Sequence, residues 1–255
     1  MGRILLKPVP RHLRVVLPLA LIYCGLAHAR TGATLNRITC EGTLGQERIG
    51  MTLFVDGKEQ FQRGHYYYAK FLKDIPLTGF LRNGKLVLRE ANGGTFTLAF
   101  KGNGSENGQP LNFENSIGLE GGWTDGEKPR PVTLRFNSMS TVANGSRWYE
   151  QVTDESDTAF EALVQGFRNA VLKGDRAAAA QYVDFPLRVN SNGRSRMVRS
   201  AAQLTTQWDS IFTPQCLEAL KKSIPHEMFV RNGQAMLGDG VAWFGAKGAQ
   251  VINIP

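Results

Sequence analysis

The stretch LTGFLRNGKLVLREANGGTFTLAF, residues 77–100, contains three short strand-like segments separated by turn residues. Asn83-Gly84 separates the first two segments, and Asn-Gly is a preferred dipeptide of two-residue hairpin turns. A glycine-rich turn then leads into Thr95–Phe100, where apolar and polar side chains alternate. Such alternation is typical of a strand with one buried face. The stretch therefore predicts three consecutive antiparallel strands.

The same pattern continues on both sides of this stretch, over residues 36–137. Met51–Val55 is a strand-like run that ends at Asp56-Gly57, another hairpin dipeptide. Thr133–Phe136 completes the set. Strands at intervals of about ten residues with glycine-rich turns indicate a β-meander, either closed as a barrel or folded as a sandwich.

Residues 157–255 differ in character and predict an α+β domain. Thr158 and Glu161 form the T-x-x-E pattern of a helix N-terminus, and apolar residues follow at helical spacing. Asn192-Gly193 predicts a hairpin, and short strands end the chain after further helices.

The order helix, helix, hairpin, helix and strands resembles the NTF2-like fold. The stretches that carry this resemblance are Phe160–Val171, Phe185–Val189 (FPLRV), Ile211–Pro214 (IFTP) and Met236–Phe244 (MLGDGVAWF). The β-rich part resembles β-modules of the bacterial envelope through Gly64–Tyr68 (GHYYY), Lys73–Gly79 (KDIPLTG) and Gly121–Gly126 (GGWTDG). The resemblance implies a bacterial exported protein of two domains, an all-β meander followed by an α+β NTF2-like domain. Fold alone does not fix function.

The first 29 residues have the three zones of a secretory signal peptide. Four basic residues and no acidic ones accompany an apolar run, Val15–Leu26, and Ala27-His28-Ala29 places small residues where a signal peptidase reads them. The run is shorter than the about 20 residues of a membrane-spanning helix. We therefore expect cleavage near Ala29, a periplasmic or secreted product, and no stable membrane span after processing. An uncleaved N-terminal anchor is the alternative.

These patterns divide the chain into four segments. They are residues 1–29 (signal peptide), 30–137 (β-rich domain), 138–156 (polar linker) and 157–255 (α+β domain).

The formal net charge is +8, and four of these charges lie in the predicted signal peptide. The processed chain is therefore only mildly basic. Nucleic-acid binding calls for a concentrated basic face, so we expect no nucleic-acid partner.

Cys40 and Cys216 remain after processing. An oxidising compartment permits a disulfide between them. Two unpaired thiols, one in each domain, are the alternative.

The sequence contains no G-x-S-x-G elbow, H-E-x-x-H zinc helix, C-x-x-C pair or phosphate-binding loop. Only His65 and His226 remain after processing, so we expect no metal and no cofactor. Catalytic members of the NTF2-like fold use a His or Asp that faces the cavity. The resemblance thus makes His226 and Asp239 the candidate acid–base groups, and a surface loop position is the alternative for His226.

Two groups of residues are candidates for binding. Tyr66 and Tyr68 share one face of a strand and predict an aromatic platform for a glycan or a protein, unless they pack in the core. Arg188, Arg194 and Arg196 lie around a hairpin and could bind an acidic partner or an anionic lipid or glycan, unless the hairpin is simply solvated.

These observations favour a non-enzymatic periplasmic protein of the bacterial envelope that binds or scaffolds an envelope protein or glycan. One alternative is a hydrolase or isomerase that uses an NTF2-like cavity. The other is a secreted inhibitor or immunity-type protein.

Overall fold

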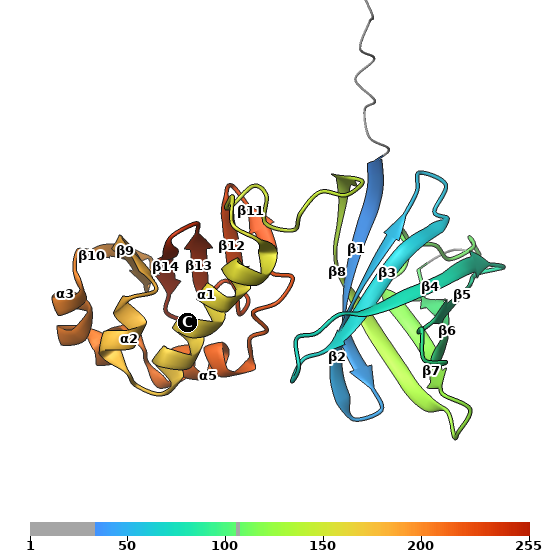
Figure 1. The fold of residues 1–255 in the computed structure, drawn as a ribbon, viewed down its shortest axis with the longest axis horizontal. Coiled ribbons are helices and arrows are strands. Elements are labelled where there is room, and N and C mark those ends of the chain that lie inside the picture. The colour runs from blue at the N-terminus through green and yellow to red at the C-terminus, as the bar shows by residue number, and fades with distance from the viewer. Residues whose placement is uncertain (1–33, 106–107) are drawn as a thin grey trace, which may run out of the picture. The chain divides into compact units, whose positions relative to one another are not determined.

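An eight-stranded antiparallel barrel forms the first part of the computed structural model, which describes residues 34–105 and 108–255 (Figure 1). The predicted signal peptide and its cleavage site at Ala29 lie outside these residues. The barrel strands are β1 (Thr34–Leu44), β2 (Glu47–Val55), β3 (Phe61–Tyr68), β4 (Ile75–Arg82), β5 (Lys85–Arg89), β6 (Thr95–Lys101), β7 (Gly118–Thr124) and β8 (Arg130–Ala143). Pairing of β1 with β8 closes the ring. Of the two architectures that the sequence left open, the barrel is confirmed.

The alternation within residues 77–100 determines which side chains fill the barrel. Alternate residues of β5 and β6 are buried. They are Leu86, Leu88, Phe96, Leu98 and Phe100. Asn83 and Gly84 join β4 to β5 with φ values of 52° and 69°, as a type I′ turn requires.

Two glycines allow β8 to approach its neighbours closely. A Cβ at Gly42 of β1 would lie 1.9 Å from the carbonyl oxygen of Thr133, and one at Gly118 of β7 would lie 2.0 Å from that of Leu134. Any larger residue would push β8 outward, so the closed barrel depends on glycine at both positions.

The rest of the described chain, residues 144–255, combines helices with a mixed six-stranded sheet (Figure 1). We call these residues the α+β part. The helices are α1 (Asp157–Leu172), α2 (Arg176–Ala180), α3 (Ala201–Thr206), α4 (Trp208–Ile211) and α5 (Pro214–Lys222). The strands are β9 (Val183–Ser191), β10 (Arg194–Val198), β11 (Phe229–Arg231), β12 (Gln234–Leu237), β13 (Ala242–Gly245) and β14 (Gly248–Asn253). Their order is β10-β9-β14-β13-β12-β11, and β9 and β14 are parallel.

The start of α1 differs from the sequence-based prediction. Ser156 is the N-cap, and its side chain accepts a hydrogen bond from the backbone N–H of Ala159 at 3.1 Å. Thr158 therefore lies inside the helix, and the predicted T-x-x-E capping pattern is wrong. The Glu161 carboxylate is free to bind other parts of the chain, where it accepts a hydrogen bond from the Tyr149 hydroxyl at 2.9 Å.

Each part of the chain has its own apolar core. In the α+β part, α1 packs against β14 and α5. The Phe167 ring of α1 meets the Phe244 ring of β13 edge to face, with centroids 5.3 Å apart. The barrel core is a separate cluster of buried residues.

Strand β8 extends to Ala143, into the segment predicted as a linker. The chain then turns toward α1, where Asp157 accepts hydrogen bonds from the backbone N–H groups of Trp148 (2.8 Å) and Tyr149 (3.1 Å). The segment 138–156 is thus partly strand and partly a turn held by α1.

Candidate functional site

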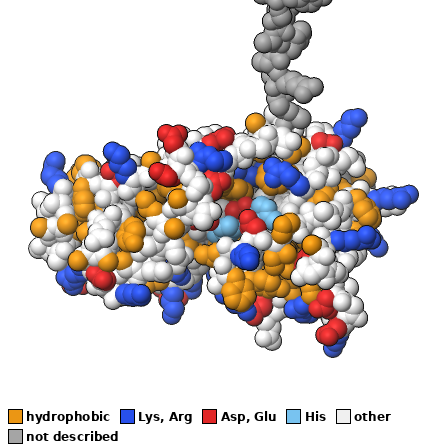
Figure 2. All heavy atoms as spheres, viewed as in Figure 1, with side chains coloured by type: hydrophobic (Ala, Val, Ile, Leu, Met, Phe, Trp, Pro, Cys, Tyr) orange, Lys and Arg blue, Asp and Glu red, His pale blue; other side chains and the backbone are white. Residues whose placement is uncertain are grey.

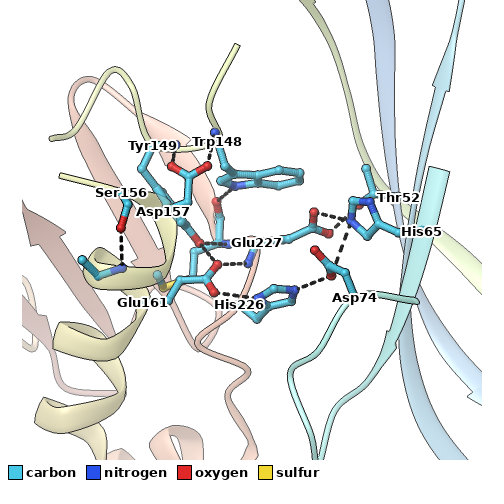
Figure 3. Close-up of polar contacts among 12 residues, drawn as sticks. Thr52, His65, Asp74, Trp148, Tyr149, Ser156, Asp157, Glu161, His226 and Glu227 are labelled. Atoms are coloured by element: carbon cyan, nitrogen blue, oxygen red, sulfur yellow. Dashed lines mark hydrogen bonds and ion pairs between the residues drawn. The ribbon is translucent and has the colours of Figure 1, made fainter. Parts of the chain in front are cut away.

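A short loop between α5 and β11, Pro225–Met228, is the centre of the candidate site (Figure 3). Two backbone hydrogen bonds hold it. The N–H of Glu227 donates to Oε1 of Glu161 (3.0 Å), and the N–H of Met228 donates to the Tyr149 hydroxyl (2.9 Å). Glu227 has φ of 48°, a left-handed conformation that is uncommon for residues other than glycine. The loop therefore presents its side chains in a fixed orientation.

His226 lies between two carboxylates, one from each part of the chain. Its Nδ1 is 2.6 Å from Oε2 of Glu161, and its Nε2 is 2.9 Å from Oδ1 of Asp74, which precedes β4. Burial lowers the pKa of His226, but the hydrogen bonds to Asp74 and Glu161 outweigh burial and raise that pKa to about 10. At neutral pH the ring is therefore a cation that donates both of its N–H groups.

Glu227 makes a second link to the barrel. Its Oε1 is 2.6 Å from Nε2 of His65, and its Oε2 accepts a hydrogen bond from the Thr52 hydroxyl at 2.6 Å. Burial lowers the pKa of His65, but the hydrogen bond and charge of Glu227 raise it overall, helped by Asp74. We call His65, Asp74, Glu161, His226 and Glu227 the charge network. The space-filling view shows histidine and acidic side chains gathered at one place on this face (Figure 2).

The charge network reaches the barrel on the outer face of β2 and β3. Thr52 lies opposite His65 and Gly50 lies opposite Tyr67, so the four residues share that face. A Cβ at Gly50 would fall 2.3 Å from Cζ of Tyr67. Without one, the Tyr67 ring lies over the strand, and its centroid is 4.4 Å from that of His226. Thr52 and Tyr67 are buried on the outside of the barrel because the loop lies against them.

His226 and Glu227 also border a cleft of about 1600 Å³. Residues of β1 and β8 line it on the barrel side, and residues of α5, β11 and the end of the chain line it on the other side. Sites for drug-sized ligands measure about 300–1,000 Å³. The cleft therefore has room for an extended ligand or a segment of a partner.

The structure separates the two acid–base candidates. His226 belongs to the charge network, whereas Asp239 is exposed in the turn between β12 and β13, with φ of 51°. Both residues line the cleft. The nitrogen atoms of His226 bind Glu161 and Asp74, so the two candidates do not work as a hydrogen-bonded pair.

Tyr66 and Tyr68 do not form an exposed platform. Tyr66 is 1% exposed, and its hydroxyl donates to Oε1 of Glu90 at 2.8 Å inside the barrel. Tyr68 is half-buried, and its ring packs edge-on against Tyr66 with centroids 5.6 Å apart. The structure thus corrects the platform hypothesis in favour of core packing, because the inward face of β3 takes both rings.

The predicted arginine cluster is not a single patch. Alternate positions of β9 and β10 point to opposite sides of the sheet, which puts Arg188 on one side and Arg196 on the other. The guanidinium of Arg196 donates hydrogen bonds to Gln207 (3.1 Å) and Ser210 (3.2 Å). Arg188 and Arg194 are exposed, and neither side chain hydrogen-bonds to a described residue. A joint surface of all three is therefore excluded by the register of the hairpin.

Cys40 and Cys216 are both buried free thiols. Cys40 belongs to the barrel core and Cys216 to the core of the α+β part, which leaves them unpaired. Burial raises the pKa of Cys216 to about 11 and raises that of Cys40 as well. The structure therefore agrees with the second alternative, two unpaired thiols, one in each part.

Three acidic members of the charge network were not predicted from the sequence. Asp74, Glu161 and Glu227 are far apart in the sequence, and Asp74 is 152 positions from His226. The sequence offers only one local cue, the adjacent His226 and Glu227 within a short loop after a helix. A pattern within one segment cannot reveal partners this far apart.

Comparison with known proteins returns no match: no family model fits the chain, and no curated protein or solved structure is significantly similar to it.

Among the residues that the structure describes, no helix has the length and apolar character needed to cross a membrane. The same residues contain no group of three or more His, Cys, Asp or Glu side chains placed to hold a metal ion.

Proposed function

We propose that this chain is a non-enzymatic binding or scaffolding protein of the bacterial envelope. In this proposal the signal peptide exports it to the periplasm or beyond, the barrel is an envelope β-module, and the α+β part is an NTF2-like domain. Its ligand or partner occupies the cleft that both parts line.

The composition of the cleft supports this proposal. Two large apolar side chains in its lining, Met139 of β8 and Phe229 of β11, are 42% and 44% exposed. Covering apolar surface is favourable by about 25 cal/mol per Å². Because these side chains come from different parts of the chain, a ligand that covers both would contact the barrel and the α+β part together.

The geometry of His226 argues against the enzymatic alternative. A general base needs a ring nitrogen that is free to take a proton from the substrate, and a general acid needs an N–H that points at the substrate. Both nitrogens of His226 face carboxylates, and its pKa of about 10 keeps it protonated at neutral pH. His226 therefore serves to join the two parts, and Asp239 alone makes no acid–base pair.

Photo-crosslinking from inside the cleft tests the proposal. Benzoylphenylalanine would replace Phe229, and the matched control would replace Phe80 of β4, which is 48% exposed and does not line the cleft. In cells that export the protein, irradiation should give a defined adduct at position 229 but not at position 80. Mass spectrometry would identify the adduct, and the purified chain should bind the same molecule. No adduct at 229, or the same adducts at both positions, would contradict binding in the cleft.

Export is tested separately by fractionating cells and sequencing the N-terminus of the protein. We expect the periplasmic or secreted form to begin at Arg30. Retention of the full-length chain in the cytoplasm would contradict the proposed location.

A further inference from the structure

Arg37 of β1 is a partly buried cation that borders the cleft and forms no hydrogen bond or ion pair with any described residue. Its guanidinium lies over the Trp148 ring, 3.9 Å from the centroid. Its Nε is buried and makes no hydrogen bond, and no described residue accepts a hydrogen bond from the rest of the group or forms an ion pair with it. Nearly all buried polar groups are hydrogen-bonded, so an orphaned one calls for an explanation.

The platform under Arg37 is rigid. The indole N–H of Trp148 donates to the carbonyl oxygen of Met228 at 2.8 Å, and its backbone N–H donates to Oδ2 of Asp157 at 2.8 Å. Both Arg37 and Trp148 line the cleft. Stacking occupies one face of the guanidinium, and Nε is its one nitrogen that is buried without a partner, so the two Nη groups remain available to a planar acceptor.

Two of the acidic groups around Arg37, Glu227 and Asp157, already have other partners. Burial lowers the pKa of Arg37, and the charges of Glu227, Asp157 and Glu150 oppose that effect without forming an ion pair. Glu227 binds His65 and Thr52, and Asp157 binds backbone N–H groups. The surrounding negative charge disfavours a doubly charged anion such as phosphate. A singly charged, planar anion fits best.

We propose that Arg37 binds the carboxylate of an apolar ligand in the cleft, through two parallel N–H···O bonds. The apolar body of the ligand lies against the exposed side chains of Met139 and Phe229. This inference rests on the proposed function and specifies the chemical class of the ligand that the cleft would bind. The carboxylate could belong to the C-terminus of a peptide or to a fatty acid, and both sources share this recognition.

Titrations followed by NMR test the proposal on the processed protein. The probes are acetyl-leucyl-phenylalanine, its C-terminal amide, and octanoate. We expect saturable shifts of the Arg37 Nε–H and Trp148 Nε1–H signals with one or both acids and none with the amide. Octanoate alone would indicate a fatty acid, and the peptide acid alone would indicate a peptide C-terminus.

Arg37→Gln should weaken binding of the acid at least about tenfold, and Arg37→Lys should weaken it less because the charge remains. Arg130→Gln is the matched control, because Arg130 stacks on Trp123 at 4.0 Å outside the cleft. Any of three results would overturn the inference. They are equal shifts with the acid and the amide, no saturable shift with either acid, and unchanged binding of the acid by the Arg37→Gln variant. A cleft-specific crosslink without acid binding would leave the proposed function standing and reject this inference alone.

Discussion

Glu227 joins the α+β part to the barrel through both of its carboxylate oxygens, which bind His65 and Thr52. Glu227→Gln keeps the shape of the side chain but turns one acceptor into a donor. We expect the free energy of unfolding to fall by about 1–3 kcal/mol, since a buried group loses its partner. Urea denaturation would measure the change.

A matched control is Glu218→Gln, on the same side of the cleft, where Glu218 forms an exposed ion pair with Lys222 at 3.2 Å. That change should cost no more than about 0.5 kcal/mol. In a double-mutant cycle, Glu227→Gln and His65→Gln should be non-additive by about 0.5–3 kcal/mol. Additive effects would show that the two side chains do not interact.

The two buried cysteines give a prediction about reactivity. The thiolate is the reactive form, and burial raises the pKa of both Cys40 and Cys216. We expect neither to react with Ellman's reagent in the native processed protein, and both to react in denaturant without a reductant. If no thiol appeared in denaturant, the two cysteines would be joined in a disulfide.

Two hydroxyl residues near the N-terminus of α1, Ser156 and Thr158, have different roles: Ser156 caps the helix and Thr158 lies inside it. Ser156→Ala should reduce the free energy of unfolding by about 1 kcal/mol, because the cap to Ala159 is lost. Thr158→Ala is the control and should be neutral or slightly stabilising, since alanine favours helix interiors. Equal losses in thermal or urea unfolding would mean that Ser156 is not the cap.

Local patterns predicted the elements well where a turn or an alternation lies within a few residues. Asn83-Gly84 and Asn192-Gly193 both have positive φ at both positions, as two-residue hairpin turns require. Strand β1 was not predicted separately, because its role is to close the barrel against β8, about 100 residues away. Closure depends on that distant pairing, which no single segment reveals.

The candidate site was predictable only in part for the same reason. Sequence reasoning found His226 but paired it with Asp239, a neighbour in the expected cavity. Its actual partners, Glu161 and Asp74, lie 65 and 152 positions away. Nothing distinguishes these carboxylates from other surface acids until the chain folds.

For the whole molecule, polar contacts join two parts that have separate cores. Besides the charge network, Arg48 of β2 donates to the carbonyl oxygen of Lys222 at 3.1 Å. The contacts of the charge network depend on the protonation of its histidines and carboxylates, whereas apolar packing does not. The link between the two parts should therefore be more sensitive to pH than either core.

The direction of this pH dependence follows from the histidines. The pKa of His226 rises from the ordinary histidine value of 6.5 to about 10 in the folded chain. Its contribution to stability is complete below about pH 6.5 and is lost as the pH rises through about 10. For Asp74, burial raises the pKa, but His226 and His65 lower it overall, so its contribution is present above about pH 4 and lost in acid. The groups facing His226 are Asp74, Glu161, Glu227, His65 and Tyr67.

We therefore expect the free energy of unfolding to decrease between about pH 7 and pH 10, by up to about 1.4 kcal/mol per pH unit for one proton. Urea titrations at constant ionic strength would measure it. The His226→Gln variant should be less stable than the parent protein at pH 7. It should also lack most of the dependence of the unfolding free energy on pH, because glutamine does not titrate. If the variant kept the slope of the parent protein, then groups other than His226 would hold the proton, and the link between the two parts would not depend on this imidazolium.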